Sequence, residues 1–231
     1  MILINNLLRK KKILSFLTIL LISGRMIFTQ DYRFGIYASP VISWFNTDIS
    51  EVRNEGSRAG FNFCATAERY FSDNYALAAG ISIINSGGRL VSSSASTFRF
   101  TSFTSVVAAG NAIVYRIQYL AIPVGLKVKT NEIGVLAYFG DLGLDPKMVI
   151  RGRVDIPSID IKGQKAMTEI SRFNMGYHIT GGIDYSLDGT TSLILGLGFE
   201  NNFFDVTKDI GDQKDDRASH KFLKFIFGIN F

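Results

Sequence analysis

The last segment of the chain alternates strictly between two kinds of residue. Every second position is apolar: Leu223, Phe225, Phe227, Ile229 and Phe231. The positions between them are mostly small or polar: Lys224, Ile226, Gly228 and Asn230. Because successive side chains of a β-strand point to opposite sides, this period of two predicts a strand with two different surroundings. An edge strand of a soluble β-sandwich would show the same period, so the segment alone does not decide what those surroundings are.

Seven more segments show the same alternation, so the sequence predicts eight strands. Their expected ranges are 32–45, 59–71, 75–84, 113–128, 133–144 with an extension toward 154, 173–187 and 191–204. In the clearest of them, Phe173 and Ile179 share one face while Asn174 and His178 share the other. Three prolines within or beside the segments each remove a ladder donor, which predicts bulges or local breaks: Pro40, Pro123 and Pro146.

The connections between the predicted strands alternate between short and long. Short turns are expected at 72–74, 130–132 and 188–189, where Asp188-Gly189 is a strong hairpin signal. Long polar links are expected at 46–58, 85–111, 152–170 and 205–219. Outer-membrane barrels combine short turns at one end with long loops at the other. The predicted fold class is therefore all-β, an eight-stranded antiparallel up-and-down transmembrane β-barrel.

The chemistry of the two faces favours a membrane barrel over a soluble one. A lipocalin-like barrel would keep its apolar residues inside and carry many charges outside. Here the second face consists mainly of Gly, Ser, Asn and Thr with a few charges, and small side chains suit the narrow bore of eight strands. The Phe, Leu and Ile face is therefore expected to contact lipid. Aromatic residues near the strand ends predict interfacial girdles: Trp44, Phe45, Phe203 and Phe204 at one end, and Tyr70, Phe71, Tyr75, Tyr185 and Phe231 at the other.

The first residues have the pattern of a secretory signal peptide. Four basic residues at 9–12 precede the apolar run 13–22, which is shorter than the roughly 20 residues of a membrane helix. We expect a signal peptide at 1–29, cleaved near 29–31, and a barrel at 30–231; an uncleaved anchor helix is the alternative. Five of the 25 basic residues lie before Gln30, and no acidic residue lies there. The other 20 basic residues equal the 20 Asp and Glu residues in number, so the rest of the chain has no net charge. The net charge of +5 thus belongs to the targeting segment and gives no reason to expect nucleic acid as a partner.

Several strand-and-turn signatures resemble a known family. They are the stretch 119–127 (Tyr-Leu-Ala-Ile-Pro-Val-Gly-Leu-Lys), the segments 129–134 and 138–140, the turn region 70–75 and the closing residues 228–231. With these signatures the chain resembles the PorT-like outer-membrane β-barrel family of Bacteroidetes over essentially its whole mature length. Members named after the founding protein are linked to type IX secretion and gliding, while most relatives are barrels without an assigned role. The resemblance implies an architecture and no catalytic residue.

The closing strand also resembles that of bacterial outer-membrane barrels in general. In such barrels the terminal Phe is recognised by the machinery that inserts them. The resemblance therefore implies an assembly signal made of the alternating aromatic residues Phe225, Phe227 and Phe231.

Residues that could carry chemistry are few. Neither His178 nor His220 has a cysteine or carboxylate at ligand spacing, and the one cysteine, Cys64, excludes an internal disulfide. We therefore expect no cofactor, no metal and no catalytic residue. The charged residues of the inward face are expected to form a paired polar network, because charges in a dry bore need partners: Arg33, Glu68, His178, Asp184, Glu200 and Lys224. An enzyme site built from the same residues is the alternative.

The expected function is that of a small non-enzymatic outer-membrane barrel. It would have a structural or interaction role at the cell surface and an accessory part in type IX-like protein secretion; a narrow passive pore for small solutes is the alternative. The expected partners are outer-membrane lipid, the barrel-assembly machinery during biogenesis, and a secretion or surface protein. The expected location is the bacterial outer membrane, and the even number of strands predicts that both termini are periplasmic.

Overall fold

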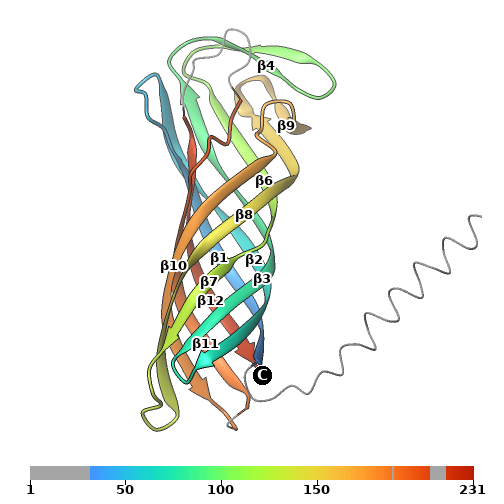
Figure 1. The fold of residues 1–231 in the computed structure, drawn as a ribbon. Helices are drawn as coiled ribbons and strands as arrows, with labels where there is room; N and C mark the ends of the chain where they lie inside the picture. The colour runs from blue at the N-terminus through green and yellow to red at the C-terminus, as the bar shows by residue number, and fades with distance from the viewer. Residues whose placement is uncertain (1–31, 189, 209–216) are drawn as a thin grey trace, which may run out of the picture. The chain divides into compact units, whose positions relative to one another are not determined.

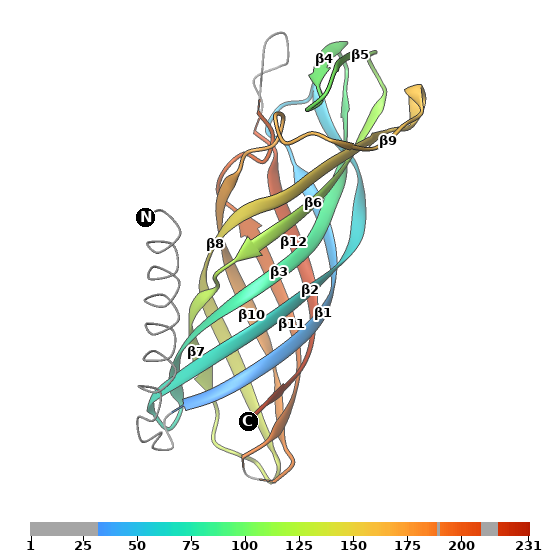
Figure 2. The same cartoon turned by 90° about the vertical axis from the view of Figure 1, so that its right-hand side faces the viewer.

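The computed structural model describes residues 32–188, 190–208 and 217–231, and Figures 1 and 2 show their strands wrapped into a barrel. Eight positions form its wall: β1 (Tyr32–Asn46), β2 (Val52–Ser72), β3 (Tyr75–Ser92), β6 (Ala112–Ala121) continued by β7 (Val124–Lys129), β8 (Leu136–Ile156), β10 (Phe173–Ser186), β11 (Ser192–Asn202) and β12 (Ser219–Asn230). Outside the wall lie β4 (Ser96–Arg99), β5 (Thr104–Val107), the 3₁₀ helix η1 (Pro157–Ile159) and β9 (Ile161–Lys165). The expected signal peptide and its cleavage site fall outside the described residues.

The wall closes on itself, because β12 pairs antiparallel with β1. The other wall strands pair with their neighbours along the chain, and β8 pairs with β10 while β9 adds to β8 from outside the ring. Closure leaves the wall without a free edge, so backbone groups can find partners without water. The predicted eight-stranded antiparallel up-and-down barrel is confirmed. Within the described residues, no helix is long and apolar enough to span a membrane.

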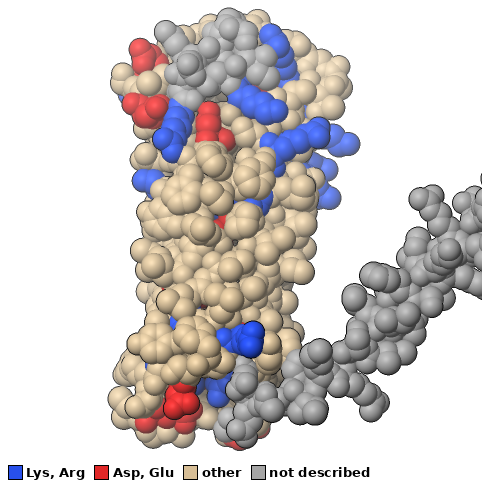
Figure 3. All heavy atoms as spheres, in the orientation of Figure 1, with Lys and Arg blue, Asp and Glu red and all other residues tan. Residues whose placement is uncertain are grey.

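The outward side chains form an apolar band around the barrel. Through the strand pairing, one row of outward positions can be followed over seven of the eight wall positions without a polar residue: Leu77, Leu126, Leu142, Ile179, Phe199, Leu223 and Ile42. On β2, the residue opposite Leu77 is Arg69. Figure 3 shows the band as a zone almost without charged atoms between two charged ends. Ile36, Phe63 and Ile81 on this face are each more than half exposed. The face expected to contact lipid is therefore the outer face.

The alternation predicted within each strand is also found. In β10, Ile179 is 54% exposed on the outside, whereas its neighbour His178 is 8% exposed on the inside. In β2, Phe63 lies outside and Glu68 is buried inside. The period of two in the sequence thus places the polar and small residues in the interior of the barrel.

The strands extend farther than the sequence indicates. β2 and β8 have 21 residues each, about twice the 9–11 residues of a strand that crosses a bilayer. The loops expected at 46–58, 85–111 and 152–170 are therefore partly strand, since β2 begins at Val52, β3 ends at Ser92 and β8 ends at Ile156. Beyond the lipid, outward residues no longer need to be apolar. The pattern that marks a membrane strand then stops, although the hydrogen-bonded ladder continues.

The three prolines differ in their effect. Residues 122–123 separate β6 from β7, so the break expected at Pro123 is confirmed. The Pro123 carbonyl accepts a hydrogen bond from the Gly80 N–H at 2.9 Å, and the Pro146 carbonyl accepts one from the Ile122 N–H at 2.9 Å. Pro40 and Pro146 lie within the continuous strands β1 and β8. Proline has no backbone N–H to donate, but its carbonyl can still accept a hydrogen bond from the neighbouring strand. The ladder therefore continues through these two positions.

The turn between β10 and β11 is closed by an aspartate. Asp188 Oδ1 accepts hydrogen bonds from the backbone N–H groups of Thr191 at 2.6 Å and Thr190 at 3.2 Å. These bonds favour the ionised carboxylate, so they lower the pKa of Asp188 below its ordinary value. The hairpin that Asp188-Gly189 predicts is confirmed by the pairing of β10 with β11 up to Ser186 and Ser192.

Candidate functional site in the barrel interior

The interior contains several groups of paired charges. We call the end where β1 begins and β12 ends the terminal end, and the opposite end the loop end. Near the terminal end, the Glu68 carboxylate of β2 lies 2.5 Å from Lys127 Nζ of β7. The hydroxyl groups of Tyr37 and Tyr70 donate hydrogen bonds to the same carboxylate at 3.3 and 3.1 Å. One buried carboxylate thus joins three wall strands through charge-assisted hydrogen bonds.

A second group surrounds Asp184 of β10. Its carboxylate lies 3.0 Å from Lys129 Nζ and 3.7 Å from Arg33 Nη1. Lys129 also lies 3.7 Å from Glu132, whose side chain is half exposed in the turn. Asp184 itself is 1% exposed, so its charge depends on these cations rather than on water.

A third group, farther from the terminal end, is centred on Glu200 of β11. Its two carboxylate oxygens form ion pairs with Lys147 of β8 and with Lys224 of β12. Lys147 Nζ also donates a hydrogen bond of 2.9 Å to Asn202 Oδ1. The side chains of Glu200 and Lys147 are fully buried, and that of Lys224 is 13% exposed. This group therefore contains two lysines and one carboxylate, and the carboxylate of Asp145 lines the same cavity as Lys224.

The nearby His178 lies between two carboxylates of β8. Its Nδ1 is 2.9 Å from Asp145 Oδ2 and its Nε2 is 3.4 Å from Asp141 Oδ1. An imidazolium can donate from both ring nitrogens, which would satisfy both carboxylates at once. The two aspartates are four residues apart on β8, so both side chains point inward. They flank the imidazole ring of His178, which comes from the neighbouring strand β10.

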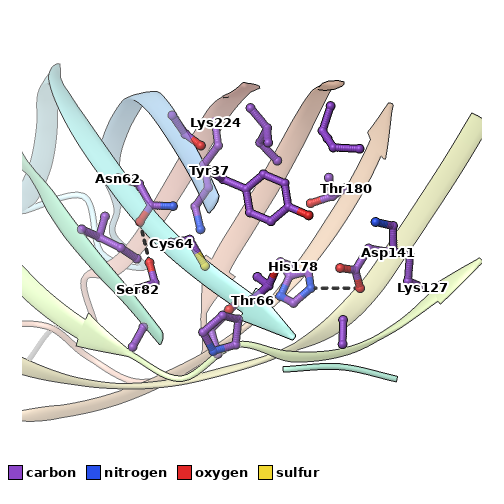
Figure 4. A pocket seen from close by; sticks show the side chains of 18 of the residues that line it. Tyr37, Asn62, Cys64, Thr66, Ser82, Lys127, Asp141, His178, Thr180 and Lys224 are labelled. Carbon is purple, nitrogen blue, oxygen red and sulfur yellow. Dashed lines mark hydrogen bonds and ion pairs between the residues drawn. The ribbon is translucent and has the colours of Figure 1, made fainter. Parts of the chain in front are cut away.

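A cavity of about 110 Å³ lies among these groups. Figure 4 shows side chains from opposite walls converging on it, with Asn62 bonded to Ser82 and His178 bonded to Asp141. Its polar lining includes Tyr37, Cys64, Thr66, Lys127, Asp145 and Lys224. The cavity has room for a few water-sized groups and is far smaller than the pockets of 300–1,000 Å³ that usually hold organic ligands.

The interior toward the loop end is filled by a buried apolar cluster. His220 forms its centre: its ring lies 4.6 Å from that of Phe45 and 4.3 Å from that of Phe222, and its Nδ1 lies 3.0 Å from the Tyr119 hydroxyl. Phe98 of β4 packs into the same cluster, 2% exposed. Phe45 and Tyr70 were expected in the interfacial aromatic girdles. Both predictions are wrong, because Phe45 falls on the inward side of β1 and Tyr70 donates a hydrogen bond to the interior Glu68. The cluster closes the bore at this level.

All six residues of the expected polar network lie on the inward side of the wall, but they do not form one network. Asp184 joins Arg33, and Glu200 joins Lys224. Glu68 and His178 instead pair with partners that the sequence reasoning missed: Lys127 for the former, Asp141 and Asp145 for the latter. Lys129 and Lys147 were missed as well. All five missed residues have odd numbers on β7 and β8, as do the inward residues Gly125 and Phe139, so the same alternation could have found them.

The chemistry of this interior is that of mutual neutralisation. Carboxylates and ammonium groups form ion pairs with one another. Among the described residues of the cavity, no Ser-His or Cys-His hydrogen bond is present that could activate a nucleophile. Among the residues that the structure describes, no group of three or more His, Cys, Asp or Glu side chains is arranged to hold a metal ion. The arrangement can hold eight strands in register and exclude bulk water.

The closed wall, the apolar band and the polar interior define a membrane-spanning β-barrel. Residues 28–208 match the family described as outer membrane protein beta-barrel domain. The match covers most of the chain, so the protein belongs to this family and is an outer-membrane β-barrel protein. No curated protein matches the chain.

Solved structures of similar fold come from several bacteria. Neisserial surface protein A is 13% identical with a TM-score of 0.47, over 85% of this chain and 95% of that one. Ail of Yersinia pestis is 10% identical with a TM-score of 0.42, over 87% of this chain and 100% of that one. OprG of Pseudomonas aeruginosa is 12% identical with a TM-score of 0.43, over 87% and 97%. At these scores the likenesses carry no argument about function.

Proposed function

We propose that this protein is a non-enzymatic barrel that acts through protein contacts at the cell surface, as an accessory to protein secretion of the type IX kind. The observation that carries the proposal is the filled interior. Ion pairs and the aromatic cluster around His220 occupy the bore, which leaves a cavity of about 110 Å³. An interior of this kind supports a wall rather than a passage or a reaction site. The PorT-like signatures of the sequence support the secretion role.

We also propose that the terminal end faces the periplasm and the loop end faces the outside. Three connections at the terminal end are short, between β2 and β3, β7 and β8, and β10 and β11. The loop end carries the hairpin β4–β5, the strand β9 and the extended ends of β2, β3 and β8 (Figures 1 and 2). Short periplasmic turns and larger external elements are the usual arrangement.

The loop end offers a structured surface to a partner. The hairpin β4–β5 is anchored there, since the Arg99 N–H donates to Glu169 at 2.8 Å and the Thr168 hydroxyl donates to the Arg99 carbonyl at 2.5 Å. Phe98 buries the other side of the hairpin in the apolar cluster. Because these elements are held in place, the binding of a partner would cost little conformational entropy.

A deletion strain tests the secretion role. We expect loss of a set of secreted proteins from the culture medium, restored by the wild-type gene. Restoration should fail with a variant in which the exposed tip residues 101–103 are replaced by glycine, a change that keeps the buried Phe98 and Phe100 and therefore the barrel. An unchanged set of secreted proteins in the deletion strain would contradict the role in secretion.

A narrow passive pore is the second candidate, because the cavity and the inward glycines Gly35, Gly125 and Gly182 reduce the side-chain volume in the bore. We expect no stable conductance from the purified wild-type protein in planar bilayers, since eight strands leave a bore that side chains can fill. Replacing Phe45, Tyr119 and Phe222 together by alanine should raise the conductance if the aromatic cluster is the barrier. Reproducible single-channel steps from the wild type would favour the pore instead.

We further propose that the alternating aromatic residues Phe225, Phe227 and Phe231 are recognised during barrel assembly. All three side chains are exposed on the outer face. The backbone of Phe231 pairs with Phe34 in both directions at 2.9 Å, and these bonds do not depend on its ring. Phe231→Ser should therefore lower the amount of barrel in the membrane several-fold and leave the refolded protein almost as stable as before. Phe71→Ser, which removes an exposed ring from another strand (65% exposed, against 53% for Phe231), is the control. Equal membrane levels of wild type and Phe231→Ser would count against recognition.

A further inference from the structure

A group of four arginines lies on the outer wall, directly beyond the apolar band toward the loop end. We call it the arginine groove; Arg58 of β2, Arg116 of β6 and Arg151 and Arg153 of β8 line a depression of about 230 Å³. Asn85 of β3 and Gln118 of β6 form part of its floor, joined by a hydrogen bond of 2.9 Å from Gln118 Nε2 to Asn85 Oδ1. Figure 3 shows Lys and Arg side chains standing out at this end, on the side where Figure 1 places β8 and β9.

The strand register places the groove at the edge of the lipid-facing surface. The last apolar row on this side consists of Phe63, Ile83, Leu120 and Met148, paired in that order across four strands. Two residues farther along the strands, roughly 7 Å, β2 still contributes Phe61, but β3, β6 and β8 contribute Asn85, Gln118 and Arg151. The next row pairs Gly87 with Arg116 and Arg116 with Arg153. The charges therefore begin where the hydrocarbon contact ends, at the level of lipid head groups.

Two irregularities of the wall build the groove. The ladder of β6 and β8 shifts between Gln118 and Tyr119, which adds Ile150 as an extra residue on β8. A bulge of this kind reverses which positions face outward. Beyond it, Gly152 and Val154 face inward and are buried, so Arg151 and Arg153 are exposed on the outer wall. Without the bulge both guanidinium groups would point into the apolar cluster.

The second irregularity lies between β2 and β3. Their pairing is interrupted between Ser57 and Phe61, the segment that contains Arg58. A Cβ atom added to Gly87 would lie 2.8 Å from Arg58 Cδ, so the absence of a side chain at Gly87 lets Arg58 lie across β3. The two irregularities thus bring guanidinium groups from three strands to one place.

Within the described residues, the charges of the groove are only partly balanced. Arg116 forms an ion pair with Asp155, whose side chain is 10% exposed. Among the described residues, Arg58, Arg151 and Arg153 form no ion pair. Arg116 stands directly opposite Arg153, and like charges in that position repel. Burial, and next the charge of Arg116, lower the pKa of Arg58, while Asp155 raises it. An anion between the guanidinium groups would remove this repulsion.

We propose that the arginine groove binds the phosphate groups of a phosphorylated lipid in the outer leaflet. Guanidinium groups bind phosphate through paired N–H donors, which suits Arg better than Lys. Basic clusters immediately beyond a hydrophobic span are typical of anionic head-group recognition. A lipid is the ligand that fits this place, because its acyl chains would lie along Phe63, Ile83 and Met148 while its phosphate reached the groove. The assignment to the outer leaflet rests on the proposed orientation of the loop end.

The test is lipid binding to the full-length mature protein in detergent, followed by native mass spectrometry. The probes are lipid A, chemically dephosphorylated lipid A and inorganic phosphate. The groove variant carries Arg58→Gln and Arg153→Gln. Its matched control carries Arg99→Gln and Lys162→Gln, which remove the same charge at the same end outside the groove. Because binding in detergent does not depend on orientation or on secretion, a failure here is separate from a failure of the proposed function.

We expect lipid A to bind the wild type and the control equally, and the groove variant about tenfold or more weakly, the loss expected for charge-assisted hydrogen bonds. Dephosphorylated lipid A should bind all three proteins weakly and alike. Arg151→Gln replaces an exposed residue without packing consequences and should weaken lipid A binding as well. It shows that weaker binding by the double variant does not come from a folding defect. Equal affinity of wild type and groove variants for lipid A would overturn the proposal. Full competition by inorganic phosphate would overturn the assignment to a lipid.

Discussion

Replacing Glu200 by glutamine is expected to destabilise the folded barrel by about 3–5 kcal/mol, the cost of leaving a buried charge without its partner. Glu200 is the shared carboxylate of Lys147 and Lys224, and the side chains of Glu200 and Lys147 are fully buried. Glutamine keeps the volume and removes the charge, so the loss reports electrostatics rather than packing. Urea unfolding of the protein in lipid vesicles, followed by the gel mobility of folded and unfolded forms, measures it.

The double variant Lys147→Met with Glu200→Gln is the control. It removes the buried ammonium together with its carboxylate, and Met fills much of the lysine volume, so most of the lost stability should return. Lys224 retains contact with the cavity. A loss of about 1 kcal/mol or less for Glu200→Gln, as for exposed ion pairs, would instead show that water screens this part of the interior.

Replacing Ile179 by arginine is expected to destabilise the barrel by roughly 2–4 kcal/mol, as for arginine on the lipid face near the bilayer midplane. Ile179 is 54% exposed and lies in the row of outward apolar residues, between Leu142 and Phe199. In a soluble barrel the same exposed substitution would cost little, so the size of the effect depends on lipid. Refolding titrations in vesicles measure it.

Thr180→Ser on the opposite face is the matched control, because it keeps a hydroxyl beside the cavity and should change stability by much less. A graded version uses Ile179→Asn, which should lose stability without the bulk of arginine. If Ile179→Asn refolded in vesicles as well as the wild type, the assignment of this row of residues to the lipid-facing surface would be wrong.

The candidate site shows how far sequence patterns reach. The alternation along β10 was enough to place His178 and Asp184 inside, and the same rule extended along β7 and β8 would have added Lys127 and Asp145. The pairing of these residues was beyond such reasoning. Which lysine meets Glu68 depends on the tilt and stagger of strands that are far apart in the chain, and these follow from closing the ring.

Two local features also escaped the sequence patterns. Phe45 looked like an interfacial aromatic, yet its place on the inward side of β1 puts it against His220. Arg151 and Arg153 face outward because of one extra residue on β8, and a period of two cannot reveal where such a residue is inserted.

The sequence by itself determined the strand class, the number of strands and the face of each strand that meets lipid, because these depend on residues adjacent in the chain and on a period of two. The tertiary structure alone decided which interior charges neutralise one another, how the aromatic cluster closes the bore and where four arginines gather on the outer wall. Each of these depends on the register between neighbouring strands. A shift of one residue in that register would exchange the two faces of a strand, so it is set by the closed wall as a whole rather than by any single segment.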